Sequence, residues 1–264
     1  MLWAYLDDSS DDKRERFCAA GGFYTVDSRW KKLEADWRSI TVGLEEPFHS
    51  TDCECGHGQF ARWAKPARDS LMAELCNIVR YHDLGAFGAC VSVPEYKAVF
   101  PSAGKHDAYL FCLGLCFANI AVVNEISNDI IRRRGVPLGP QDVHFWVEES
   151  RDTAARATQV YKSLRSLASW RPSHRMAGIA HLGKETIGLQ TADLVAREVY
   201  KFYNNQGVRP IRKPVITLAQ NISFVGPTLE NLQEFKIAAS RVGHAVALTM
   251  VAARITQSEA NPII

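Results

Sequence analysis

The sequence predicts an α/β fold in which a mixed β-sheet is flanked by helices, with additional helical insertions. Three observations lead to this prediction. The chain has 264 residues, of which 47% are hydrophobic and 23% charged, so it can build a large buried core. Strand-type and helix-type hydrophobic periods alternate along it. No repeat, low-complexity stretch or linker interrupts them, so we expect a single domain over residues 1–256 and a flexible tail at 257–264.

The first 40 residues predict a β-hairpin followed by a helix. Residues 2–6 and 17–26 are apolar runs on either side of a polar turn, and the pair Gly21-Gly22 suggests a bulge or a close backbone approach. After Asp27-Ser28, a pair suited to an N-cap, hydrophobic residues recur at steps of three and four up to residue 40. That period predicts an amphipathic helix.

The middle of the chain predicts two helices separated by a strand. Residues 47–52 suggest a short extended piece or a loop. A helix is expected to begin at Pro66, because the fixed φ angle of proline suits a first helical turn. Residues 85–93 fit a buried strand, and 105–131 are apolar nearly all round, which predicts a helix at the centre of the protein.

The second half continues the alternation. Residues 143–148 alternate between apolar and polar, as a half-buried strand does. A helix at 152–167, a strand at 176–182 and a helix at 186–203 follow. Residues 204–227 contain three prolines and are expected to be mostly loop, and 228–256 predict a closing amphipathic helix.

Composition limits the compartment and the partners. There are 31 Lys and Arg against 29 Asp and Glu, so the formal charge is +2, which excludes a strongly basic clamp of the histone type but permits a local basic groove. Seven cysteines, an odd number, and an N-terminus without a basic region before its apolar run predict a cytoplasmic protein. The longest apolar stretch, 108–118, is too short for a bilayer span, so no membrane partner is expected.

Acidic residues stand where strands and helices run out of apolar residues. Asp7 and Asp8 close the first strand, Glu148 and Glu149 close the strand that begins at residue 143, and Asp193 interrupts the apolar face of a helix. Carboxylates rarely lie beside a core unless they are paired or hold a cation. Acids that converge at one sheet edge would suit Mg²⁺ or Mn²⁺, and such ions support phosphodiester hydrolysis.

Three segments carry a resemblance to a known family. They are Tyr5-Leu6-Asp7-Asp8-Ser9-Ser10 with the strand that follows, Phe48-His49-Ser50-Thr51-Asp52, and Gly188-Leu189-Gln190-Thr191-Ala192-Asp193-Leu194-Val195-Ala196. In this order, over roughly residues 1–203, the sequence resembles the bacterial domain-of-unknown-function family 3800. The last segment is similar to the family's Leu-Gln-x-Ala-Asp helix motif. The first is similar to its Asp-Glu-Ser-Gly opening, with Asp8 in place of Glu and Ser10 in place of Gly.

The resemblance implies an RNase H-like fold. In that fold a strand-borne Asp, a second strand-borne acid and a helix-borne Asp bind divalent metal. It therefore implies that Asp7, Glu148 and Asp193 are both the metal ligands and the catalytic residues. Asp8 is shorter and stiffer than the Glu of the family, so it is a secondary candidate.

The strand-borne acids each have a plainer interpretation. Asp7 could cap the hairpin turn. Asp8 points to the opposite pleat if the strand continues, which favours solvation at the turn. Glu149 would take the place of Glu148 if the strand register slipped by one residue, so it too is a secondary candidate.

The residues around the helix motif have alternatives as well. Arg197 lies four residues after Asp193, a spacing that suits a surface ion pair. Gln190 could orient a carboxylate or a water, or could make an ordinary hydrogen bond on the helix surface. Lys184 could contact a phosphate, or it could be a solvated lysine in a turn.

His49 and Asp52 are further secondary candidates. The histidine could act as a general base or proton shuttle near neutral pH, whereas an aspartate in a loop is commonly a turn former. The spacing of His49, Cys53, Cys55 and His57 also suggests zinc. However, one residue between the cysteines is less than structural zinc sites use, and reduced thiols in a polar loop are the alternative.

Several basic residues could line a nucleic-acid groove, although a solvated helix end and loop would explain them equally well. They are Arg132, Arg133, Arg134, Arg209, Arg212 and Lys213.

The hypothesis that these features favour is a divalent-metal-dependent nuclease of RNase H-like type. The alternative is a catalytically degenerate RNase H-like module that binds nucleic acid or a protein, and a third hypothesis is an interaction subunit. Nucleic acid is the expected partner. The sequence leaves open whether it is DNA or RNA, and which oligomeric state the protein adopts.

Overall fold

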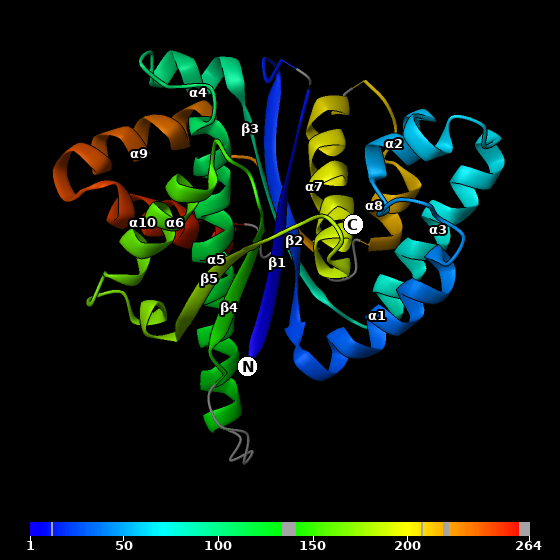
Figure 1. Cartoon of the computed structure of the whole chain (residues 1–264). Coiled ribbons are helices and arrows are strands. Elements are labelled where there is room, and N and C mark those ends of the chain that lie inside the picture. Colours follow the sequence, from blue (N-terminus) through cyan, green and yellow to red (C-terminus); the bar gives the residue numbers. More distant parts are fainter. Residues whose placement is uncertain (12, 134–140, 207, 219–221, 259–264) are drawn as a thin grey trace.

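The computed structural model describes residues 1–11, 13–133, 141–206, 208–218 and 222–258. The protein is built on one six-stranded sheet with the strand order β5-β4-β1-β2-β3-β6 (Figure 1). The strands are β1 (Leu2–Ser10), β2 (Phe17–Val26), β3 (Gly85–Ser92), β4 (Val143–Glu148), β5 (Met176–Leu182) and β6 (Ile222–Val225). Strands β1, β2 and β3 pair antiparallel, whereas β4 and β5 continue the sheet from β1 in parallel and β6 pairs parallel with β3. The predicted mixed sheet is confirmed.

Helices cover both faces of this sheet (Figure 1). The α-helices are α1 (Asp27–Thr41), α2 (Ser50–Cys55), α3 (Lys65–Tyr81), α4 (Val93–Val99), α5 (Asp107–Arg133), α6 (Ala154–Arg165), α7 (Ile187–Asn205), α8 (Lys213–Leu218), α9 (Leu229–Val242) and α10 (His244–Ser258). Two short 3₁₀ helices are η1 (Gly58–Phe60) and η2 (Arg171–Arg175). Helix α5 with α6, α9 and α10 forms the core on one face, and α7 with α1 and α3 forms the core on the other.

The central helix α5 is more apolar than the sequence analysis allowed. Its segment from Asp107 to Ile130 is long and apolar enough to cross a bilayer by length and composition, so the estimate from the shorter run at 108–118 was wrong. However, 78% of its most apolar window is buried inside the fold. Such burial is typical of a core helix, as predicted from its apolar residues on all sides.

Helix α7 approaches the sheet closely because two strands offer glycine beneath it. A side chain at Gly21 on β2 would meet Val195, and one at Gly88 on β3 would overlap Val199. The close approach expected at Gly21-Gly22 is therefore confirmed, and β1 and β2 pair there without a bulge. This packing fixes the height of α7 above β2 and β3.

The predicted loops contain elements that the sequence analysis missed. Residues 50–55 form α2, and 204–227 include α8 and the edge strand β6. Helix α4 follows β3 directly. The closing helix is broken into α9 and α10 at Gly243, and α10 continues to Ser258, two residues into the expected tail. Residues 259–264 of that tail lie outside the described part of the chain.

Gly243 gives a direct test of this break. Its backbone has φ +88° and ψ 155°, a region that residues with a Cβ rarely adopt, although the space around it is empty. We expect Gly243→Ala to lower the free energy of unfolding by about 1–3 kcal/mol through backbone strain alone. Urea denaturation checks this, with Gly43→Ala as the control, because Gly43 also has empty space around it but no positive φ. Equal stabilities of the two variants would contradict the strain.

Candidate functional site

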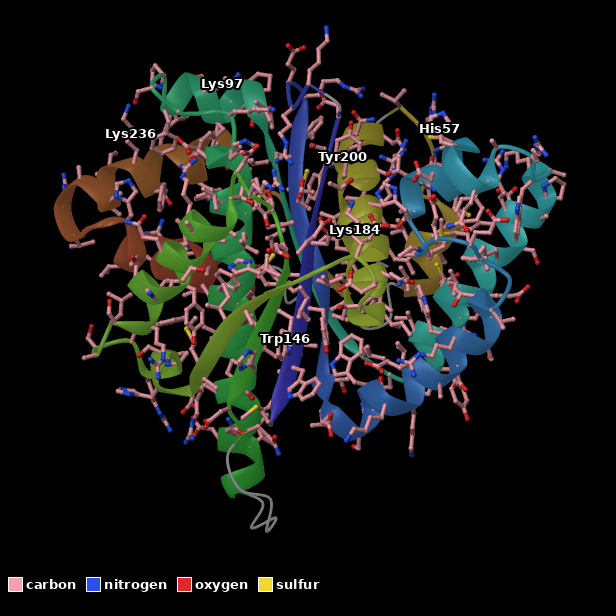
Figure 2. The ribbon with its side chains drawn as sticks, in the orientation of Figure 1. His57, Lys97, Trp146, Lys184, Tyr200 and Lys236 are labelled. Carbon is pink, nitrogen blue, oxygen red and sulfur yellow. The ribbon has the colours of Figure 1, made fainter. Side chains whose placement is uncertain are left out.

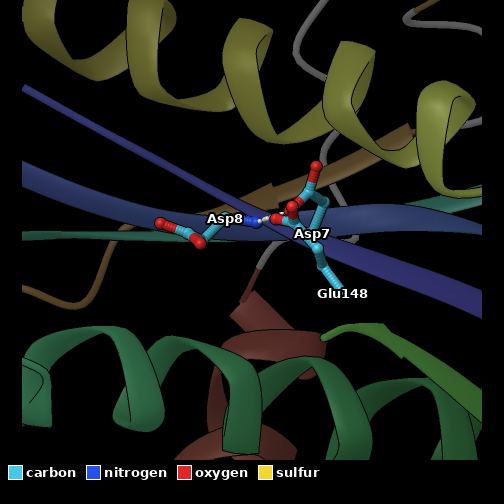
Figure 3. A group of neighbouring side chains, drawn as sticks. All are labelled: Asp7, Asp8 and Glu148. Atoms are coloured by element: carbon cyan, nitrogen blue, oxygen red, sulfur yellow. Dashed lines mark hydrogen bonds between the residues drawn. The ribbon is translucent and has the colours of Figure 1, made fainter. Parts of the chain in front are cut away.

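Strand pairing brings two distant acids to the same place on the sheet. The parallel register of β1 and β4 pairs Leu6 with Val147, so the next residues, Asp7 and Glu148, lie abreast on adjacent strands. Both side chains lie on the face that α7 covers, because side chains of odd-numbered residues of β1, such as Tyr5, pack in the core on that face. Figure 3 shows the two carboxyl groups together between the strands and α7.

The carboxylates at this point are close enough to share a cation. Asp7, Asp8 and Glu148 each offer one oxygen, and these oxygens lie within 4.8 Å of one another. Over the described ranges, no other group of acids, histidines or cysteines meets this criterion. Asp7 Oδ1 also accepts a hydrogen bond of 2.7 Å from the backbone N–H of Asp8, which fixes its orientation (Figure 3). An all-oxygen donor set of this kind suits Mg²⁺ or Mn²⁺.

Asp7 is buried among like charges. Its burial raises the pKa of its carboxyl group well above the usual value, and the nearby carboxylates of Glu148 and Asp193 raise the pKa further. Burial and the neighbouring carboxylates both make the ionised form of Asp7 less favourable, because its negative charge is removed from water without enough positive charge nearby. A divalent cation at this point would supply the missing positive charge.

Asp8 lies in a different environment from its neighbour. Strand β1 continues to Ser10, so Asp7 and Asp8 lie within the strand, and the interpretations of turn capping and turn solvation were both wrong. Asp8 points away from Asp7, as the alternation of a strand requires (Figure 3). Arg14 Nη2 lies 2.7 Å from Asp8 Oδ2. Burial raises the pKa of Asp8, and Arg14 counteracts this rise.

Asp193 is held over the site by helix α2. Its Oδ2 accepts hydrogen bonds from the backbone N–H and the Oγ–H of Ser50, at 2.5 and 2.6 Å. The side chain is buried, and it does not form the suggested surface pair with Arg197. Asp193 lies outside the 4.8 Å group, yet near enough for its charge to raise the pKa of Asp7. Ser50 was missed in the sequence, since a six-residue helix is too short to show a period.

His49 connects Asp193 to a second acid. His49 Nδ1 lies 3.0 Å from Asp52 Oδ2, and its Nε2 lies 3.9 Å from Asp193 Oδ1. The imidazole is partly exposed, so it is accessible from solvent. Asp52 therefore orients the ring that faces Asp193, which fits its place as a secondary candidate better than a role as a turn former does.

Gln190 is a tether within the core. Its Oε1 accepts hydrogen bonds from Trp37 Nε1 and from the backbone N–H of Phe48, at 3.0 and 3.3 Å. Its Nε2 donates to the backbone carbonyls of Lys184 and Glu185. The side chain is buried, so the interpretation as a helix-surface hydrogen bond was wrong. Gln190 instead ties the segments that carry His49 and Lys184 to α7.

Of the two remaining candidates beside β4 and β5, Lys184 lies at the site and Glu149 does not. Lys184 Nζ lies 3.1 Å from Glu148 Oε1 while 61% of its side chain is exposed, so the lysine is solvated and also paired with the site. Burial alone would lower the pKa of Lys184, but the carboxylates of Glu148, Asp7 and Asp193 outweigh it and raise the pKa. Glu149 is exposed, and its backbone N–H donates to the carbonyl of Leu182. The register did not slip, and Glu148 is the acid on the site face.

Arg197 belongs to an ion-pair cluster that the sequence analysis did not foresee. The cluster is centred on Glu54 of α2, which lies 2.9 Å from Arg197, 3.4 Å from Lys201 and 3.0 Å from Arg212. Burial opposes the ionised form of Glu54, but Arg212 and Arg197 together lower its pKa. The cluster fastens α2, and with it Ser50, to α7.

The zinc hypothesis is not supported. Cys53 is buried in α2 whereas Cys55 is exposed, so the two thiols leave the helix on different sides. Burial raises the pKa of Cys53 to about 11, which disfavours the thiolate that zinc requires.

Two of the residues suggested for a basic groove, Arg209 and Arg212, line one pocket together with Lys201. The side chains of the run at 132–134 lie outside the described part of the structure. Arg209 and Lys213 are exposed, whereas Arg212 is engaged with Glu54 and Glu198.

Comparison of this chain with protein-family models, with curated proteins and with solved structures gives no match.

The raised pKa of Asp7 makes a prediction about stability. A carboxyl whose folded-state pKa exceeds its unfolded value destabilises the fold when pH rises above the unfolded value, and therefore at neutral pH. We expect Asp7→Asn to stabilise the metal-free protein, by on the order of 1 kcal/mol or about 2–4 °C in Tm. Asparagine can still accept the hydrogen bond from Asp8 N–H. Thermal unfolding with a chelator measures this, with Asp69→Asn on the surface of α3 as the control. A lower Tm for Asp7→Asn would contradict the electrostatic account.

Glu198 makes a separate prediction about pH. Its burial raises its pKa to about 7, so the folded state binds a proton more tightly than the unfolded state does. Stability from this group is therefore present near pH 5 and is lost as pH rises through 7. We expect the free energy of unfolding of Glu198→Gln, relative to that of the wild type, to be about 1–3 kcal/mol higher at pH 8 than at pH 5. Urea denaturation at both pH values measures the difference, with exposed Glu149→Gln as the control. A pH-independent difference would show that Glu198 does not titrate in this range.

Proposed function

We propose that the protein is a divalent-metal-dependent phosphodiesterase, and specifically a nuclease of RNase H-like type. The observation that carries the proposal is the pair of carboxylates of Asp7 and Glu148 on adjacent parallel strands, with Asp193 on the helix above them. These are the three kinds of position that the resemblance to the domain-of-unknown-function family 3800 implies: a strand-borne Asp, a second strand-borne acid and a helix-borne Asp. Their charges are mutually repulsive, which supports a site for Mg²⁺ or Mn²⁺.

Each side chain has a distinct part in the proposed reaction. Bound Mg²⁺ or Mn²⁺ supplies Lewis-acid activation of the phosphodiester and lowers the pKa of an attacking water. Asp7 and Glu148 would hold such an ion from the sheet, and Asp193, fixed by Ser50, would contribute a carboxylate from α7. Lys184 is placed beside Glu148 to contact a phosphate oxygen. His49, oriented by Asp52, can hold or pass a proton at Nε2 on the Asp193 side.

A direct cleavage assay tests the proposal. We expect the wild type with Mn²⁺ or Mg²⁺ to cleave labelled single- or double-stranded DNA or RNA. Asp7→Asn should cleave at least about 100-fold more slowly, since it removes a charged ligand of the ion, a loss of roughly 3 kcal/mol in transition-state stabilisation. Asp69→Asn, a surface substitution on α3, is the matched control. Equal cleavage by the wild type and Asp7→Asn would contradict the proposed site.

The catalytically degenerate module stays the alternative, and two observations favour it. Asp8, which stands in place of the Glu of the family, is engaged with Arg14, and Asp193 lies outside the 4.8 Å group. This alternative predicts no cleavage by either protein, together with salt-sensitive nucleic-acid binding that a chelator does not change. A filter-binding series with and without chelator separates it from the nuclease.

A further inference from the structure

A stripe of aromatic side chains leads along the sheet to the acidic site. The register of β1 and β4 places Tyr5 beside Trp146, one step of the pleat before Asp7 and Glu148, and Trp3 beside His144, two steps before them. On β5 the neighbours of His144 and Trp146 are Gly178 and Ala180. The His144 ring lies over Gly178, where a Cβ would overlap it, so these small residues give the β4 rings room on the β5 side.

The rings of this stripe pack against one another. The His144 and Trp146 centroids are 4.5 Å apart, and the Tyr5 and Trp146 rings lie 6.1 Å apart with an angle of 17° between their planes. Trp3 meets Trp146 edge to face at 5.9 Å. The stripe is therefore a preformed aromatic surface whose ring positions are fixed by their neighbours.

Helix α7 covers only the inner part of this face. Tyr5 is buried beneath Gly188 of α7, whereas Trp3, His144 and Trp146 are only half-buried. The outer strands β4 and β5 extend beyond α7 in Figure 1, and Figure 2 shows Trp146 and Lys184 along this side of the sheet. Within the described part of the chain, Trp146 Nε1 and His144 Nε2 are buried and have no hydrogen-bond partner. The accessible surface of the outer rings is therefore carbon rather than polar atoms.

From this arrangement we propose that Trp146, with His144 and Trp3, is a stacking platform for the unpaired bases of a single-stranded nucleic acid. The inference rests on the proposed function, because it takes the acidic site as the point at which the strand is cut. Trp146 and Glu148 are two residues apart on one strand face, or roughly 7 Å, so a phosphate next to a base on the platform reaches Glu148 and Lys184.

The platform selects single strands for a physical reason. Base faces in a duplex are already stacked on their neighbours, whereas an unpaired base can turn onto an aromatic ring. Stacking accepts every base, so the platform confers a preference for unpaired strands without sequence specificity. DNA and RNA share this chemistry, and the experiment separates them.

Binding is measured in the Asp7→Asn background, where no cleavage is expected to disturb the equilibrium. The probes are fluorescent oligothymidylate, oligouridylate, an abasic strand of the same length and a duplex, each with Mn²⁺. We expect Trp146→Ala to weaken binding of one or both base-bearing single strands by about 5- to 100-fold and Trp146→Phe to retain most of it. The abasic strand and the duplex should bind Asp7→Asn weakly and should be insensitive to Trp146→Ala. The control is Trp63→Ala, at an exposed tryptophan beside Phe60 that makes no ring contact with the stripe.

Several results would overturn the platform. They are equal binding with and without the Trp146 ring, equal binding of abasic and base-bearing strands, tighter binding of the duplex, or no nucleic-acid binding at all. If Trp146→Ala fails to fold, Trp146→Phe and the abasic strand still decide the question. Failure of the proposed function looks different: the platform binds single strands, yet the wild type cleaves none of them. Conversely, cleavage that depends on Asp7 but not on Trp146 would contradict the proposed platform and leave the proposed nuclease activity standing.

Discussion

The main energetic constraint on the site is the repulsion between the carboxylates that the fold brings together beneath α7. Asp7 is buried, and the charges of Glu148 and Asp193 add to the cost of ionising it. A protein gains nothing in stability from such an arrangement, because replacing one acid by a neutral residue would relieve it. Acids kept together against this cost are typical of sites that bind a cation or carry out chemistry. The proposal of a metal centre follows from this energetic argument as much as from the distances.

The rest of the architecture fixes the third acid above the other two. Glycines in β2 and β3 let α7 approach the sheet, and α2 then clamps Asp193 through Ser50. The cluster of Glu54 with Arg197, Lys201 and Arg212 fastens α2 to α7. Gln190 ties the segment before α2 and the turn after β5 to the same helix. Helix α7 is therefore the element on which the geometry of the whole site depends.

The elements that carry the acids could be predicted from the sequence, whereas the elements that position them could not. Strands β1 and β4 and helix α7 are long enough to show clear hydrophobic periods, and their acids interrupt those periods visibly. Helix α2 and strand β6 have six and four residues, too few for a period, so Ser50 and Glu54 gave no sign of their roles. The partner of Arg197 was also beyond prediction. Asp193, at a helical spacing, was an obvious candidate for an ion pair with Arg197. In the fold, however, Arg197 pairs with Glu54, which lies 143 positions away.

The acids on the two faces of β1 differ in how far the charges of the chain itself balance them. On the α5 side, Asp8 has Arg14 at 2.7 Å, so its charge is neutralised within the chain. On the α7 side, Asp7, Glu148 and Asp193 have one lysine among them, Lys184, which reaches Glu148. The excess of negative charge is thus confined to the α7 side, and the proposed divalent ion would balance it there. An oxygen of Asp8 lies within 4.8 Å of oxygens of Asp7 and Glu148, so Asp8 borders the site even though Arg14 balances its charge.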